Sequence, residues 1–120
     1  MDTSKIIRTS YLVKGDQGHV CRASLPPIYQ YDRGMQIKID DIPHEDGLTY
    51  RLDAANEGDE TAIILEEIGP DLWQLDDDLI KNGRNIELYL FVKGAGWGRT
   101  IRIWDILVTD RPKADRTPGA

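Results

Sequence analysis

Residues 85–109 read NIELYLFVKGAGWGRTIRIWDILVT, and this stretch decides the fold class. Every second residue from Ile86 to Val92 is aliphatic, and the intervening residues, from Glu87 to Lys93, form the opposite face. A period of two is typical of a β-strand with one face in the core. The glycine-rich segment Gly94–Gly98 then predicts a hairpin connection, because tight turns use backbone conformations with positive φ.

The second half of this stretch is apolar on both faces. Trp104, Ile106, Leu107 and Val108 crowd together around Asp105. A strand with two apolar faces lies in the centre of a sheet, whereas a bulge near Asp105 would shift the pleat and give the same pattern. Both interpretations make residues 100–109 (TIRIWDILVT) a strand.

The same alternation extends toward the N-terminus. Residues 35–42 (MQIKIDDI) and 48–54 (LTYRLDA) each place apolar residues on one face, and HEDG (His44–Gly47) lies between them as a turn. Residues 62–68 (AIILEEI) and 71–75 (DLWQL) are shorter strand candidates. Short strands at intervals of roughly 8–12 residues are typical of a β-sandwich or barrel.

Two further features complete the predicted organisation. IIRTSYLV and HVCRASL flank GDQG (Gly15–Gly18), which predicts an N-terminal hairpin set off by Pro26 and Pro27. LDDDLIKNG predicts one short helical turn, with Asp76 or Asp77 as its cap and Gly83 at its end. We therefore predict an all-β antiparallel sandwich with an N-terminal hairpin extension, divided into an arm (1–27), a sandwich domain (28–110) and a flexible tail (111–120).

Composition narrows the class of function. The chain has 120 residues and a formal net charge of −6, with 40% hydrophobic and 30% charged residues. This is the composition of one globular domain, and its acidic balance argues against binding of nucleic acid. No apolar run approaches the length of a membrane span, and the single cysteine, Cys21, excludes an internal disulfide.

The charge is segregated along the chain. Residues 1–36 carry five basic and three acidic residues, a net of +2, and residues 88–120 carry six basic and three acidic residues, a net of +3. Residues 37–87 carry four basic and fifteen acidic residues, a net of −11. The acids either cover solvent-exposed faces or make the subunits complementary head to tail, since complementary potentials guide docking.

Residues suited to catalysis or metal binding are few. His19 and Cys21 would share one face of a strand, but no orienting third group accompanies them. Asp40, Asp41 and Asp46 supply oxygen ligands in one loop without the alternating spacing of a calcium site. We expect no enzyme activity, no metal and no cofactor.

The aromatic residues leave one alternative open. Trp97 is expected at the tip of a hairpin, where it docks either on a partner or on the body of the domain. Aromatic faces stack on sugar rings, so a carbohydrate-binding module that contacts a host glycan is the alternative function. Trp73, Trp104 and Tyr50 are expected in the core instead.

Three segments in this order resemble a known family. They are YQYDRGMQIKID (Tyr29 to Asp40), LDDDLIKNGRNIELYLFV (Leu75 to Val92) and GRTIRIWDILVTDRPKA (Gly98 to Ala114). The set resembles small immunoglobulin-like β-sandwich domains of bacteriophage virions, related to the N-terminal domain of siphophage baseplate upper proteins and to tail and head fibre proteins. Asp76 and Ala114 depart from it, since the family often has proline at both positions.

The resemblance implies an assembly protein rather than an enzyme. It implies an immunoglobulin-like fold, a place in the virion after assembly in the host bacterial cytoplasm, and contacts with other phage structural proteins and with further copies of the chain. Because the sequence given ends at Ala120, we expect a standalone subunit of the tail, baseplate or head surface. The candidate interface residues are Tyr29, Tyr31, Arg33, Trp97, Arg99 and Arg111.

Overall fold

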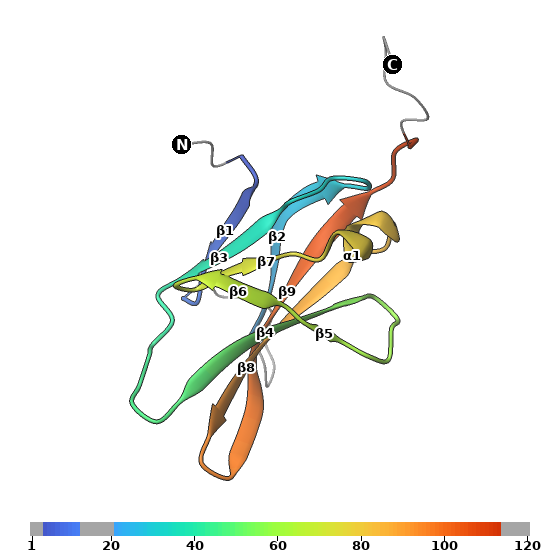
Figure 1. The fold of residues 1–120 in the computed structure, drawn as a ribbon. Helices are drawn as coiled ribbons and strands as arrows, with labels where there is room; N and C mark the ends of the chain where they lie inside the picture. Colours follow the sequence, from blue (N-terminus) through green and yellow to red (C-terminus); the bar gives the residue numbers. More distant parts are fainter. Residues whose placement is uncertain (1–3, 13–20, 114–120) are drawn as a thin grey trace.

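A computed structural model describes residues 4–12 and 21–113 of the chain. Within these residues the chain forms strands and one short helix (Figure 1). The elements are β1 (Ile6–Ser10), β2 (Cys21–Tyr29), β3 (Gln36–Asp40), β4 (Thr49–Asn56), β5 (Ile63–Ile64), β6 (Glu66–Gly69), β7 (Leu72–Gln74), α1 (Asp77–Lys81), β8 (Ile86–Gly94) and β9 (Trp97–Thr109).

Two mixed sheets pack face to face as a β-sandwich. One sheet has the strand order β1-β3-β7-β6, and the other has the order β2-β9-β8-β4-β5. The predicted all-β sandwich is therefore confirmed. Its core fills the space between the sheets, and the largest fully buried side chains are Trp73, Trp104, Ile37, Ile39, Leu52, Leu75, Ile80, Ile86, Leu88, Leu90, Ile106 and Asn56.

The alternation along β8 and the two apolar faces of β9 have the predicted consequences. Ile86, Leu88 and Leu90 are fully buried between the sheets. β9 is a central strand that pairs with β8 on one side and with β2 on the other. The pairing with β8 does contain an extra residue, but at Ile101, between the pairs Phe91↔Thr100 and Leu90↔Arg102, rather than near Asp105.

The predicted N-terminal hairpin is wrong. β1 pairs parallel with β3, from Ile6↔Gln36 to Ser10↔Asp40, whereas β2 pairs parallel with β9 in the other sheet. The two strands therefore complete opposite layers, and the sheets are mixed rather than purely antiparallel. A turn sequence such as GDQG, which lies outside the described residues, favours reversal of the chain but does not determine which strand becomes the partner.

Pro26 and Pro27 lie within β2 and do not separate an arm from a body. Leu25 pairs with Ile106 and Ile28 with Val108, so β2 carries one extra residue here. Proline lacks the N–H that a central strand needs, and an edge strand with a bulge accommodates it. The predicted boundary at residue 27 is thus crossed by a continuous edge strand. Of the predicted tail, residues 111–113 have no regular structure, and residues 114–120 lie outside the described residues.

The predicted helical turn is confirmed as α1. The Asp76 carboxylate accepts a hydrogen bond from the Asp78 amide at 2.8 Å, and Leu79 and Ile80 are buried. Gly83 follows with a φ of 72°, a left-handed conformation in which glycine is favoured. The predicted strand over residues 62–68 is split into β5 and β6, because the chain crosses from one sheet to the other at the buried Leu65.

A buried amide joins α1 to the sheets. Asn56, at the end of β4, has no exposed surface. Its Nδ2 donates to the carbonyl oxygens of Leu79 (2.8 Å) and Arg84 (3.1 Å), and its Oδ1 accepts from Asn82 Nδ2 at 2.8 Å. One side chain thereby satisfies the backbone of the segment that connects α1 to β8.

Replacing this amide should destabilise the domain. The substitution Asn56→Leu leaves two carbonyl groups without their donor, and a buried unsatisfied polar group costs about 1–3 kcal/mol. Urea unfolding followed by circular dichroism measures the free energy of unfolding. Thr49→Ala, at an exposed position of the same strand, should change it by less than about 0.5 kcal/mol. Equal stabilities of the two variants would contradict the structural role of Asn56.

The position of β1 gives a second prediction. Ile7 is buried in the core, whereas its neighbour Ile6 is half-buried. Ile7→Ala should lower the free energy of unfolding by about 2–4 kcal/mol, as for other truncated core side chains, and Ile6→Ala by clearly less. A loss below about 0.5 kcal/mol for Ile7→Ala would mean that β1 is a detachable arm.

Candidate functional site

The six predicted interface residues lie at two ends of the sandwich. Trp97 and Arg99 are at the start of β9, beside the turn of the β8–β9 hairpin, whereas Arg111 follows the end of the same strand. A strand rises about 3.3 Å per residue, so the 13 residues of β9 separate the two groups by roughly 40 Å. The other residues, Tyr29, Tyr31 and Arg33, belong to the end that holds Arg111.

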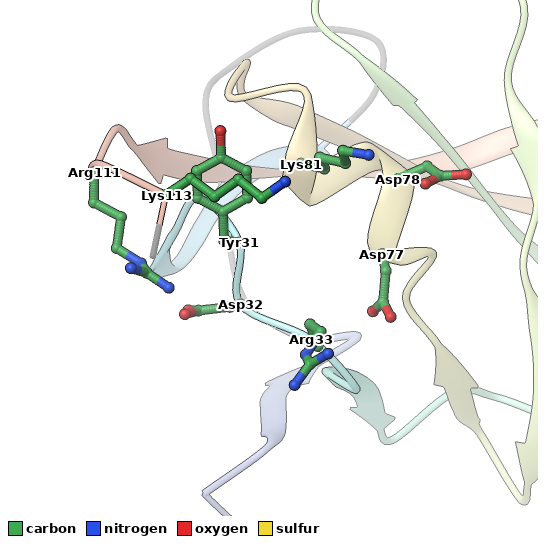
Figure 2. Close-up of a pocket in the computed structure, with 8 residues that line it drawn as sticks. All are labelled: Tyr31, Asp32, Arg33, Asp77, Asp78, Lys81, Arg111 and Lys113. Atoms are coloured by element: carbon green, nitrogen blue, oxygen red, sulfur yellow. The ribbon is translucent and has the colours of Figure 1, made fainter. Parts of the chain in front are cut away.

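A pocket at the α1 end brings three of the six together. We call it the α1-end pocket, and its volume is about 550 Å³. Figure 2 shows basic side chains around Tyr31 and Asp32, with Asp77 projecting from α1 toward the loop that carries Arg33. The lining residues are Tyr31, Asp32, Arg33, Asp77, Asp78, Lys81, Arg111 and Lys113.

Parallel pairing of β2 with β9 forms this pocket. The carboxyl ends of parallel strands meet at the same edge, and here Gln30 N donates to the carbonyl oxygen of Thr109 at 2.8 Å. The residues that follow the two strands are therefore neighbours. Tyr31 and Arg111 lie together, with the Arg111 guanidinium 5.7 Å from the centre of the Tyr31 ring.

Local hydrogen bonds fix the loop that carries Tyr31. The Asp32 carboxylate accepts from the Tyr29 amide at 3.0 Å. Tyr31 has a φ of 73°, a left-handed conformation that is uncommon outside glycine and asparagine. Tight turns impose such conformations, and this one directs the Tyr31 side chain toward the pocket (Figure 2).

Two contacts attach the loop to α1. Asp77 Oδ1 accepts from the Gly34 amide at 3.0 Å, and Gln30 Nε2 donates to the carbonyl oxygen of Lys81 at 3.0 Å. The pocket therefore lies where the end of β2, the end of β9 and α1 meet. Four basic and three acidic side chains line it, together with Tyr31, so its surface is of mixed charge.

The hydrogen bond from the Gly34 amide to Asp77 gives a testable prediction. Asp77→Ala removes the acceptor of the Gly34 N–H, so hydrogen exchange at that amide should accelerate by roughly tenfold or more, whereas amides in β8 should be unaffected. Two-dimensional NMR measures both rates in one sample. Asp78→Ala, one residue along α1, is the matched control, because Asp78 accepts no hydrogen bond from Gly34. Unchanged exchange at Gly34 would contradict the proposed attachment.

The hairpin end carries a second aromatic group. Trp97 is 47% exposed and lies over Gly94, where a Cβ atom would come within 2.5 Å of its ring. The Arg51 guanidinium lies 4.5 Å from the centre of the neighbouring Phe91 ring and is held by Asp53 at 2.7 and 2.9 Å. The hydrogen bond to Asp53 raises the pKa of Arg51 above its ordinary value. Trp97 thus docks on its own hairpin and keeps about half of its surface exposed.

The carboxylates considered for a metal site do not converge. The Asp40 carboxylate binds the Arg8 guanidinium at 2.7 and 3.2 Å, and Asp41 accepts from Ser10 Oγ at 2.7 Å. The hydrogen bond from Arg8 lowers the pKa of Asp40. Among the described residues no three histidine, cysteine or acidic side chains are grouped to hold a metal ion. His19 and the side chain of Cys21 lie outside the described part of the structure.

A third surface carries residues that the sequence analysis did not select. Residues 57–68, which we call the acidic edge, are exposed except for Leu65. They contain Ile63, Ile64 and Ile68, with exposed fractions of 40%, 61% and 40%. The signal was present in the sequence, because two adjacent isoleucines in a strand point to opposite faces and both cannot enter the same core.

Comparison with known proteins assigns neither a family nor a function to the chain. The chain matches no protein-family model and no curated protein. In the described part of the chain, no helix has the length and apolar character needed to cross a bilayer.

Proposed function

We propose that the chain is a bacteriophage virion structural protein, a subunit of the tail, baseplate or head surface that acts by protein–protein assembly. The observation that supports this proposal is a group of exposed apolar side chains on the acidic edge. Ile63, Ile64 and Ile68 are all exposed on two short strands that end their sheets. Exposed sheet edges with apolar side chains favour association, and soluble monomers usually protect them.

The strand order supports an immunoglobulin-like sandwich, as the sequence resemblance implies. The order β9-β8-β4-β5 corresponds to the order G-F-C-C′ of variable-type immunoglobulin domains, and β3-β7-β6 corresponds to B-E-D. β2, parallel to the last strand, and β1 flank these two sets. Such sandwiches serve many unrelated functions, so the proposal rests on the surface and on the resemblance of the three sequence segments.

Particle composition tests this function. Phage particles whose genome encodes the chain can be purified by density gradient and analysed by quantitative mass spectrometry. We expect the chain in a fixed copy number relative to the major capsid or tail protein, and the same copy number after a second gradient. Its absence from intact particles would contradict a structural role in the virion.

The exposed Trp97 supports a second candidate, a carbohydrate-binding module. Trp97 borders a cavity of about 310 Å³ that Arg51, Phe91 and Lys93 also line. The indole can stack on a sugar ring, while the neighbouring charged side chains can form hydrogen bonds with the hydroxyl groups of the sugar. Binding on a glycan array that Trp97→Ala abolishes, and that Tyr29→Ala at the other end leaves intact, would favour this candidate over assembly.

A further inference from the structure

The two lateral sides of the sandwich differ in chemistry. β1 and β2 end the two sheets on one side and contact each other, and β5 and β6, joined through Leu65, end them on the other. We call residues 4–12 and 21–29 the basic edge. In Figure 1, β1 and β5 lie on opposite sides of the molecule.

The charges of the two edges are opposite. The acidic edge contains Glu57, Asp59, Glu60, Glu66 and Glu67 and no lysine or arginine. The basic edge contains Lys5, Arg8 and Arg22 and no aspartate or glutamate. Arg84 binds Asp59 at 2.9 Å and Arg8 binds Asp40, so each edge has part of its charge compensated within the subunit. Counted from the sequence with these two partners included, the acidic edge keeps a net negative charge, and the basic edge keeps a net positive charge from Lys5 and Arg22. The side chain of Arg22 lies outside the described part of the structure.

Exposed apolar side chains follow the same division. Among the described residues, seven large hydrophobic side chains are exposed. Ile63, Ile64 and Ile68 belong to the acidic edge, and Leu12 (66% exposed) and Tyr29 (55% exposed) belong to the basic edge. Only Trp97 and Leu107 lie elsewhere among those seven. The isoleucines of the acidic edge are close together in the sequence, whereas Leu12 and Tyr29 lie near opposite ends of the basic edge. Each edge therefore presents exposed apolar side chains among charged residues of one sign.

We propose that the acidic edge of one copy docks on the basic edge of a second copy, so that the subunits join head to tail. This inference rests on the proposed assembly function and names the partner and the surfaces. Two acidic edges repel each other, and so do two basic edges, which disfavours a symmetric dimer through either. Because the joined surfaces are different, the contact is heterologous and repeats into a ring or a filament.

Side chains rather than a long backbone ladder make this contact. β5 pairs with β4 over only two residues, and β2 contains Pro26 and Pro27, which donate no backbone hydrogen bond. The exposed apolar side chains then supply burial, while the opposite charges set register and speed association.

Two single substitutions test the proposal on the full chain. Ile64→Lys removes an apolar side chain from the acidic edge and introduces the wrong charge, and Tyr29→Glu does the same to the basic edge. Sedimentation velocity should show oligomers for the natural chain and at least tenfold weaker self-association for each variant. Because both positions are more than half exposed, the variants should keep the circular dichroism spectrum of the natural chain.

An equimolar mixture of the two variants is the decisive experiment. Each variant retains one intact edge, so the mixture should form a heterodimer and nothing larger. Thr49→Glu, which adds a charge at an exposed position of β4 outside both edges, is the control and should assemble like the natural chain. Raising the salt from 0.1 to 1 M should weaken assembly, since the screening length falls from about 10 to about 3 Å.

Several results would overturn the inference. They are a natural chain that stays monomeric at high concentration, a variant that associates as tightly as the natural chain, a mixture without heterodimer, or assembly that does not weaken at 1 M salt. A monomeric chain that mass spectrometry finds in purified particles would overturn only the head-to-tail contact. A chain that self-assembles but is absent from particles would overturn only the virion function.

Discussion

The pairing of β9 on both of its sides is the interaction on which the rest of the structure depends. Antiparallel pairing with β8 aligns Leu88 with Trp104, and both side chains are buried between the sheets. Parallel pairing with β2 extends the same sheet by a strand that is distant in the sequence. Because a parallel partner cannot come from a tight turn, the N-terminal segment has to cross the domain to supply it.

This second pairing determines where the α1-end pocket and the proposed assembly surfaces lie. It places the residues after β2 beside the residues after β9, which brings Tyr31 and Arg111 into one pocket. It also makes β2 an edge strand, next to β1, on the side opposite β5 and β6. Part of the charge segregation along the chain, that of residues 57–68 from residues 4–12 and 21–29, thereby becomes a separation between two sides of the molecule.

Local patterns were sufficient to predict the layers and the helix. The alternation from Ile86 to Val92, the caps of α1 and the burial of Trp73 and Trp104 all depend on near neighbours in sequence, and the structure confirms them. The partner of the first strand was not predictable in this way, because an apolar face on β1 is buried equally well by a hairpin or by a parallel neighbour. Tyr31, Arg33 and Arg111 were each selected as interface residues, but predicting that they lie in one pocket requires knowledge of the β2–β9 pairing. Predicting that the isoleucines are exposed requires knowledge that the strand breaks at Leu65.

Hydrogen–deuterium exchange compared between dilute and concentrated samples of the natural chain tests whether opposite edges of the sandwich are its assembly surfaces. Peptides covering residues 21–29 and 57–68 should gain protection together as the concentration rises, while the β8–β9 turn should not change. Protection that appears at only one edge, or instead around α1 and residues 30–34, would contradict it.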